Sequence, residues 1–505
     1  MKHIRKKQRL NSWIAAGAGA LAAVTAVSTG QCATPSDPLL DALIKKGVLT
    51  ESEAKDIQAE TQTNSATASM SKFKIADTIK NLNLYGDARF RYEYRGADNP
   101  KSAGLTPGNT YYRERFRYAL RFGIKGDLYD NFSYGIRLET SSNPRSTWVT
   151  FGDDVGKSSS AGGGTPSDRS SDLLSIGQVY LNWHPADYYE MTVGRMPMPL
   201  YTTPMVWDSD IEPEGAFEKF KLSLGNVDLF ADAGQFMYQD ANPDTKAPSS
   251  DTFMFAWQVG ATIKLDKDIS FKLAPTIYNY AGHGTGNGLN IPFVGQGSAT
   301  GTNPGSTGGA GVAALNQNGI NNLLIFELPA EFNMKLGNYH LRAFGDFGYN
   351  LKGDDRARSA FAAGGGTAGS FPGLGSPATG NNMAYQVGIG IGNEGPVYGP
   401  TQGLVYGSTS KKNTWEARVY WQHVEQYSLD VNLLDSDFFE GRGNLEGVYG
   451  AFAYSLTDAI IGTVRFGYAN RIDNNLGTGG SNFDLPGLNP IRNYHILQAD
   501  LTWRF

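Results

Sequence analysis

Apolar and polar residues alternate strictly over several long segments of this chain. In residues 81–95 the even positions run from Leu82 to Tyr94 without a charge, whereas the odd positions include Asp87 and Arg89. The same alternation recurs in five further segments, residues 111–125, 132–140, 253–265, 324–334 and 415–421. A period of two residues places one set of side chains on each face of a β-strand. The pattern therefore predicts strands with one apolar and one polar face, and aromatic residues lie near their ends.

The length of the alternating segments separates two kinds of β-protein. Strands of soluble sandwiches average about five or six residues, whereas a strand that crosses a bilayer needs about 9–11. Several segments here alternate for longer than that, and the last one, residues 494–505, ends on Leu501, Trp503 and Phe505. An uncharged face of this length suits lipid, where Lys or Arg at the midplane costs about 2–4 kcal/mol. We therefore expect an all-β fold, a transmembrane antiparallel β-barrel, with a soluble sandwich as the alternative.

The connections between the predicted strands alternate between short and long, as in bacterial barrels. We expect about 16 strands, a typical number for a barrel with an aqueous channel. The short links are residues 126–131, 185–188, 225–226, 266–268, 337–338 and 457–458. The long ones are residues 96–110, 141–172, 196–215, 239–251, 281–321, 352–382, 425–443 and 471–492. Residues 393–413 break the rule, so either an insertion lies at the short-turn end or one hairpin is miscounted.

The N-terminal region has the features of a secretory signal. Basic residues from Lys2 to Arg9 precede an apolar, Ala-rich stretch from Trp13 to Val27. We expect export and cleavage after Ser28, or as late as residue 33. The predicted domains are a signal peptide at 1–28, a periplasmic helical hairpin at 37–60, a linker at 61–80 and an outer-membrane barrel at 81–505.

The predicted hairpin at 37–60 has leucines at helical spacing, a stop at Gly47, and Thr50 with Glu53 as a capping box for a second helix. Two interpretations remain open for it. It is either a solvated plug or spacer, or a contact to a neighbouring subunit or to the cell wall.

Composition and motifs weigh against several other classes of protein. The net charge of −5 does not favour nucleic-acid binding, and beyond the signal no apolar run is long enough for a helical span. A single cysteine, Cys32, excludes an intramolecular disulfide. The six histidines lack metal-ligand spacing, and residues 390–395 match a dinucleotide fingerprint without the helix that it needs. We predict no enzyme, no catalytic residue, no metal and no cofactor; a hydrolase assembled across strands remains an alternative.

Three motifs and the C-terminal residue resemble a known family. They are the helical entry at residues 37–50, the first strand at 85–95, the segment Val206-Trp-Asp-Ser-Asp-Ile-Glu-Pro-Glu-Gly215, and the terminal Phe505. With these the chain resembles the bacterial outer-membrane putative porins and, more distantly, the phosphate-selective porins. The resemblance implies a water-filled diffusion channel and a homotrimer.

Charged residues gather on the polar faces of the first strands and in one long connection. The basic set that we expect to line the pore is Arg89, Arg91, Arg113, Arg115, Arg117, Arg121 and Arg137. The acidic set lies in residues 196–215 and consists of Asp208, Asp210, Glu212 and Glu214. By resemblance to general porins this connection folds inward, so its acids would face the basic wall across the constriction. Opposed rows of charge would orient polar solutes there; alternatively, the charges merely pair with one another.

The sequence thus predicts a porin in the outer membrane of a Gram-negative bacterium, surrounded by outer-membrane lipid. We expect passive diffusion of ions and small polar solutes, with a bias toward anions. The alternatives are a dedicated oxyanion-selective channel and a non-conducting barrel that serves as an anchor or in adhesion. No nucleic acid is expected as a partner, and a cell-wall contact would run through residues 37–60.

Overall fold

The computed structural model describes residues 78–98, 110–141, 146–152, 174–240, 251–286, 319–363, 376–393, 411–479 and 490–505. The predicted signal peptide, helical hairpin and most of the linker lie outside these residues. Among the described residues no helix has the length and apolar character needed to cross a membrane.

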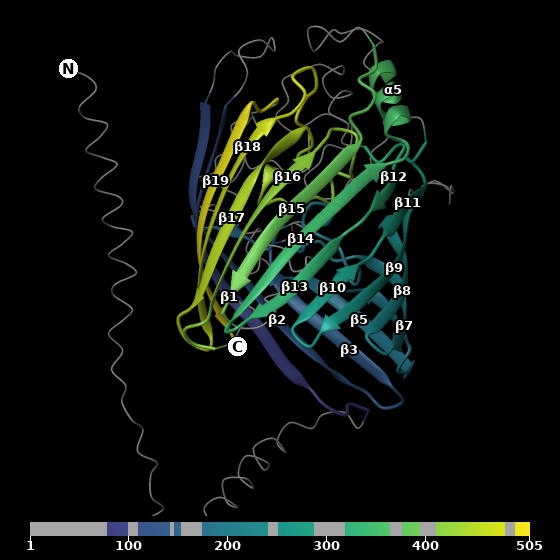
Figure 1. Cartoon of the computed structure of the whole chain (residues 1–505), viewed down its shortest axis with the longest axis vertical. Coiled ribbons are helices and arrows are strands. Elements are labelled where there is room, and N and C mark those ends of the chain that lie inside the picture. The colour runs from purple at the N-terminus through teal and green to yellow at the C-terminus, as the bar shows by residue number, and fades with distance from the viewer. Residues whose placement is uncertain are drawn as a thin grey trace, which may run out of the picture. The chain divides into compact units, whose positions relative to one another are not determined.

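The described chain forms one antiparallel sheet that closes on itself (Figure 1). Its first half contains β1 (Asn83–Asp98), β2 (Thr110–Asp127), β3 (Phe132–Thr140), β4 (Val149–Thr150), β5 (Leu174–Ala186), β6 (Tyr189–Arg195), β7 (Glu214–Leu224), β8 (Val227–Gln239) and β9 (Thr252–Asp266). Its second half contains β10 (Ile269–Leu273), β11 (Thr276–Gly282), β12 (Leu324–Glu327), β13 (Ala330–Leu336), β14 (Tyr339–Asn350), β15 (Met383–Gly392), β16 (Trp415–Val424), β17 (Leu445–Ser455), β18 (Ile460–Arg471) and β19 (Asn493–Arg504). Two short helices, α5 (Gly353–Ala363) and the 3₁₀ turn η4 (Phe439–Gly441), lie in long connections.

These strands make a barrel of 16 members, as the sequence predicts. Strands β10 and β11 both pair with β9, so they are two parts of one strand that is interrupted at Pro275. Strands β12 and β13 likewise both pair with β14 and are two parts of one strand that is interrupted at Pro329. Proline lacks the N–H that a ladder needs. The two residues of β4 pair with β2 beyond the end of β3.

The ladder between β1 and β19 closes the barrel. It runs from Asp87 opposite Arg504 to Asp98 opposite Asn493. Backbone bonds between Gly86 and the terminal Phe505 extend it, with N to O distances of 3.0 and 3.1 Å. The final strand therefore occupies the position that its alternating pattern predicts.

The two faces of the sheet differ as the alternation predicts. On the outer face Phe116 and Ile389 are each 62% exposed, and none of the apolar residues of β9 that the sequence places there is buried. Aromatic rings meet near the short turns, for example Phe132 with Trp183 and Tyr189 with Phe220. The inner face carries the buried charged side chains.

The connections also follow the predicted alternation of short and long. Strands β15 and β16 pair in register from Ala384 opposite Val424 to Gly392 opposite Glu416, so the strand count is right. The long connection between them starts at the short-turn end of the barrel. Of the two alternatives for residues 393–413, the insertion at that end therefore holds, and not the miscounted hairpin. Helix α5 lies at the opposite, long-loop end (Figure 1).

Asp500 ties the closing strand to both of its neighbours. Its Oδ1 accepts a hydrogen bond from Nε of Arg91 on β1 at 2.7 Å, and its Oδ2 accepts one from Arg465 on β18. All three side chains are buried. A buried charge that loses its partner typically costs 3–5 kcal/mol.

We therefore expect Asp500→Ala to lower the free energy of unfolding by about 3–5 kcal/mol, measured by urea unfolding of the detergent-solubilised barrel. The matched control is Asp228→Ala, which breaks an exposed ion pair with Lys264 and should cost less than about 1 kcal/mol. Equal losses in the two variants would contradict the closing role of Asp500.

Candidate functional site

A basic wall covers the inner face of the first strands. Arg89, Arg91 and Arg95 lie on β1. On β2, Arg113 lies opposite Arg95, Arg115 opposite Glu93, and Arg117 opposite Arg91. The remaining predicted residues continue this wall toward the short turns, Arg121 on β2 and Arg137 on β3. Every arginine expected from the sequence is therefore on the inner face. Arg95 and Arg465 also belong to the wall and were missed.

Carboxylates on the same strands pair with this wall. Glu93 accepts from Arg95 at 3.0 Å and from Arg115 at 2.6 Å. Asp87 binds Arg121 at 2.8 Å and Arg89 at 2.9 Å. Yet the eight inward arginines of β1, β2 and β3 face only four inward carboxylates on those strands, Asp87, Glu93, Glu139 and, at the end of β2, Asp127. Positive charge on the wall therefore exceeds negative charge.

The connection 425–444 supplies part of the missing negative charge. It lies against the wall, with Oδ1 of Asp437 2.8 Å from Arg91 Nη1 and 3.3 Å from Arg95 Nη2. Gln498 donates to the same oxygen at 3.0 Å. Burial alone would raise the pKa of Asp437, but Arg91 and Arg95 hold this pKa at about 2. Asp437 therefore keeps its charge at neutral pH.

The connection 196–213 also folds into the barrel and is fixed to several of its strands. At one end Glu212 accepts hydrogen bonds from Arg137 at 2.6 Å and from Gln178 at 3.0 Å. Farther along, Thr202 donates to Glu327 on β12 at 2.6 Å, and Thr203 donates to Asp346 on β14. This connection therefore extends from β3 and β5 toward β12 and β14.

The two inward connections also bind each other. Asp208 N donates to the carbonyl of Leu433 at 2.6 Å, and Asp208 Oδ2 accepts from Ser436 N at 3.0 Å. Asp435 N donates to the carbonyl of Pro204 at 3.2 Å. Burial, together with the charges of Asp208 and Asp437, raises the pKa of Asp435 well above its usual range. The connections thus form one layer inside the barrel.

The four predicted acids do not share one environment. Asp208 binds the other inward connection, and Asp210 is half-buried with its N–H bonded to Asp208. Glu212 contacts an arginine of the predicted set, Arg137. Glu214 departs from the prediction of a loop acid: it is the first residue of β7, its side chain is 60% exposed, and it pairs with Arg195 at 3.7 Å. The strand starts earlier than the sequence pattern suggested.

A tryptophan from the connection between β3 and β5 covers part of the basic wall. The ring of Trp148 is centred 4.0 Å from the guanidinium carbon of Arg91, 4.8 Å from that of Arg89 and 5.9 Å from that of Arg117. Trp148 is itself buried. Sequence reasoning missed it because it lies in a polar, Gly- and Ser-rich stretch outside any periodic pattern.

Cavities open below the inward connections, toward the short turns. One of about 590 Å³ lies between residues 198–201 and four lysines, Lys219, Lys221, Lys264 and Lys272. The Nζ of Lys272 is 3.6 Å from the ring centre of Tyr201. Another, of about 770 Å³, is lined by residues of β9, β10 and β13 to β16, among them Arg342 and Arg418. The inner face at this end is polar and hollow.

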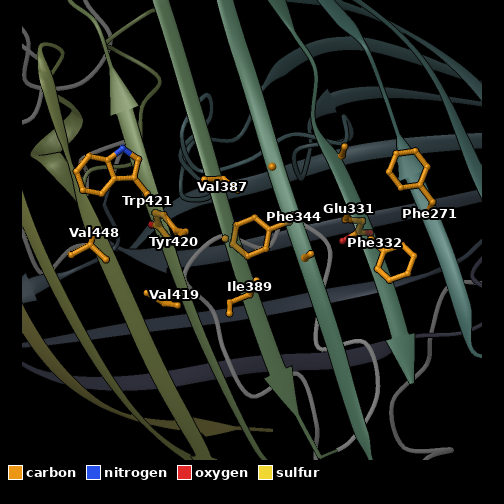
Figure 2. A pocket seen from close by; sticks show the side chains of 14 residues that line it. Phe271, Glu331, Phe332, Phe344, Val387, Ile389, Val419, Tyr420, Trp421 and Val448 are labelled. Carbon is orange, nitrogen blue, oxygen red and sulfur yellow. The ribbon is translucent and has the colours of Figure 1, made fainter. Parts of the chain in front are cut away.

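A further hollow of about 610 Å³ lies on β10 and β13 to β16 and has a different character (Figure 2). Val387, Ile389, Val419 and Trp421 line it, and these side chains are exposed on the outer face. Its walls are almost entirely apolar. It offers no group for binding a polar solute and is part of the apolar exterior.

Residues 96–286 match the model of the putative porin family. The resemblance seen in the sequence is thus confirmed over this region, from the end of β1 through β11, which includes the inward connection 196–213. No curated protein matches the chain. Among solved structures, a high-pH structure of OprB from Pseudomonas putida is similar with 9% identity and a TM-score of 0.45, covering 84% of this chain and 94% of that chain.

The carboxyl group of Glu212 makes the stability of the folded protein depend on pH. Its Oε2 is buried without a hydrogen-bond partner, and burial, opposed by Arg137, raises the pKa of Glu212 from 4.5 to about 7. Between these values the folded protein holds a proton that the unfolded chain has released, so stability falls as pH rises through this window.

We expect Glu212→Gln to remove this decline, which amounts to at most about 3 kcal/mol between pH 4.5 and 7.5. Urea unfolding at a series of pH values measures it. Glu214→Gln, an exposed change two residues away, should keep the wild-type slope. A Glu212→Gln slope equal to that of the wild type would show that the carboxyl does not titrate in this window.

Proposed function

We propose that this protein is an outer-membrane porin, a channel through which ions and small polar solutes diffuse passively. The observation that carries the proposal is the pair of connections, 196–213 and 425–444, folded inside a 16-stranded barrel and bonded to its wall. Such an arrangement narrows a lumen at one level and leaves polar, hollow space beneath it. The apolar exterior suits lipid.

The match to putative porins and the barrel fold point to a channel and not to an enzyme. In the described ranges, no group of three or more His, Cys, Asp or Glu side chains is arranged to hold a metal ion. The proposed channel needs neither a catalytic residue nor a cofactor, since passive diffusion requires only an open path.

The proposed bias toward anions comes from the surplus of arginine on the wall. Much of that surplus is compensated by Asp437 and Asp500, and by Glu212 when it is ionised, so we expect a moderate bias and not strict selectivity. Arg89 and Arg121 share the single carboxylate of Asp87, and their side chains keep 11% and 18% exposure. We propose Arg121, the more exposed of the two, as the arginine that a permeating ion meets first.

We further propose that the barrel assembles as a homotrimer. Strand β6 has seven residues, fewer than the 9–11 that span a bilayer. Where it ends, Arg195 pairs with Glu214 on the outer face. Charges on a lipid-facing wall are costly, and the cost falls if a second copy covers them. The sector around β6 and β7 is therefore our candidate for the contact between subunits.

Two observations favour alternatives. The lysines beside Tyr201 would suit a dedicated oxyanion channel, in which conductance saturates with phosphate concentration. The complete burial of residues such as Phe439 and Arg442 in connection 425–444 would suit a non-conducting barrel for anchoring or adhesion. Conductance separates these alternatives from the porin.

The proposal is tested by single-channel recording of the mature protein in a planar bilayer under a salt gradient. We expect stepwise conductance that rises with salt and a reversal potential biased toward anions. Silence under all conditions would refute the porin and favour the anchor; saturation with phosphate would favour the oxyanion channel.

Replacing Arg117 and Arg121 together by Ser removes two positive charges from the wall and should shift the reversal potential toward cations. The control is Arg358→Ser on the exposed side of α5, far along the chain from the basic wall and paired with Asp355. No shift in the double variant, with conductance intact, would remove these arginines from selectivity.

A further inference from the structure

Trp148 and its neighbour Thr147 contact three arginines of the basic wall. Thr147 Oγ1 accepts from Arg89 at 2.7 Å, and the carbonyl of Trp148 accepts from Arg117 at 3.1 Å. The indole ring covers the guanidinium of Arg91 at 4.0 Å. A stretch of only three residues, 146–148, thus engages three arginines from two strands.

The guanidinium nitrogens of Arg91 are hydrogen-bonded as well. Asp500 accepts from Nε and Nη2 at 2.7 and 2.9 Å, and Asp437 accepts from Nη1 at 2.8 Å. With the ring on its face, the side chain of Arg91 is only 2% exposed. Arg117 is covered similarly, with 8% exposure. The interior of the basic wall is therefore screened from the lumen water, in contrast to Arg121 at its lower end.

The way in which residues 146–151 join the barrel fixes this position. Thr150 and Val149 pair with Arg117 and Tyr118 of β2, and Thr140 Oγ1 donates to the carbonyl of Thr147 at 2.7 Å. Phe151 packs on the outer face against Tyr118, with ring centres 5.2 Å apart. The backbone of this stretch is thus anchored in the wall, and Trp148 lies inward of it.

We propose that Trp148 sets the strength of the channel's anion preference by shielding Arg89, Arg91 and Arg117 from permeating ions. This inference rests on the proposed porin function. An indole stacked on a guanidinium excludes water and anions from that face while the charge stays in place. Because Trp148 is itself buried, removing the ring opens space beside the three guanidinium groups that water and anions from the lumen can enter, and an accessible positive wall concentrates anions near it. Trp148 is then a residue that limits selectivity without itself carrying a charge.

The test compares Trp148→Ala with the wild type in planar bilayers, using potassium chloride on both sides at unequal concentration. We expect the chloride-to-potassium permeability ratio to rise by about twofold or more, together with a higher conductance, because the cation-covering ring and its volume are both gone. Trp148→Phe keeps a ring over the arginines and should remain close to the wild type, which separates shielding from a general disturbance of the loop.

Phe151→Ala is the matched control, because it removes a ring from the same stretch on the outer face and should change neither quantity. If the wild type conducts and Trp148→Ala keeps the wild-type chloride-to-potassium permeability ratio, the shielding role is overturned while the porin function stands. A silent wild type would overturn the porin function and this inference with it. Should Trp148→Ala fail to fold, Trp148→Leu takes its place, because it covers the wall with a smaller, aliphatic side chain. We expect its chloride-to-potassium permeability ratio to be higher than that of the wild type and of Trp148→Phe, but lower than that of a fully uncovered wall. A permeability ratio below that of the wild type would contradict shielding.

Discussion

The structure depends on arginine side chains that cannot stay buried without negative partners. Eight of them line β1, β2 and β3, and the carboxylates of those strands are too few to compensate them. Leaving such a charge unpaired costs several kcal/mol, whereas Asp437 and Glu212 can satisfy it from the connections. The excess of arginine therefore stabilises two loops inside the barrel that would otherwise be free to extend into water.

The inward position of the two connections follows from this charge balance. Connection 425–444 is held by Arg91 and Arg95, connection 196–213 by Arg137 on one side and by Glu327 and Asp346 on the other, and Asp208 joins the two. The same arginines thus have two effects that oppose each other. In the proposed channel they would attract anions toward the lumen, and they are largely neutralised by the acids that they bind. A channel built in this way would select moderately.

The sequence predicts the barrel well and its interior only in part. Strict alternation assigns residues such as Arg115 and Phe116 to opposite faces, because a strand leaves no other choice. The path of a loop has no such period. Phe439 and Glu440 adopt positive φ angles of 61° and 56°, which no pattern of apolar residues reports, and Asp437 reaches Arg91 across 346 positions of sequence. Trp148 was missed and Glu214 was misplaced for the same reason, since each depends on where a loop joins a strand.

Amide hydrogen exchange of the folded protein in detergent tests most directly whether the wall holds both loops inside the barrel. We expect peptides from 196–213 and 425–444 to exchange about as slowly as the strands, because their N–H groups are buried and bonded, for example Asp208 N–H to the carbonyl of Leu433. Exchange within seconds over both connections, while the strands stay protected, would show that the loops are open to water and that the basic wall does not hold them inside the barrel.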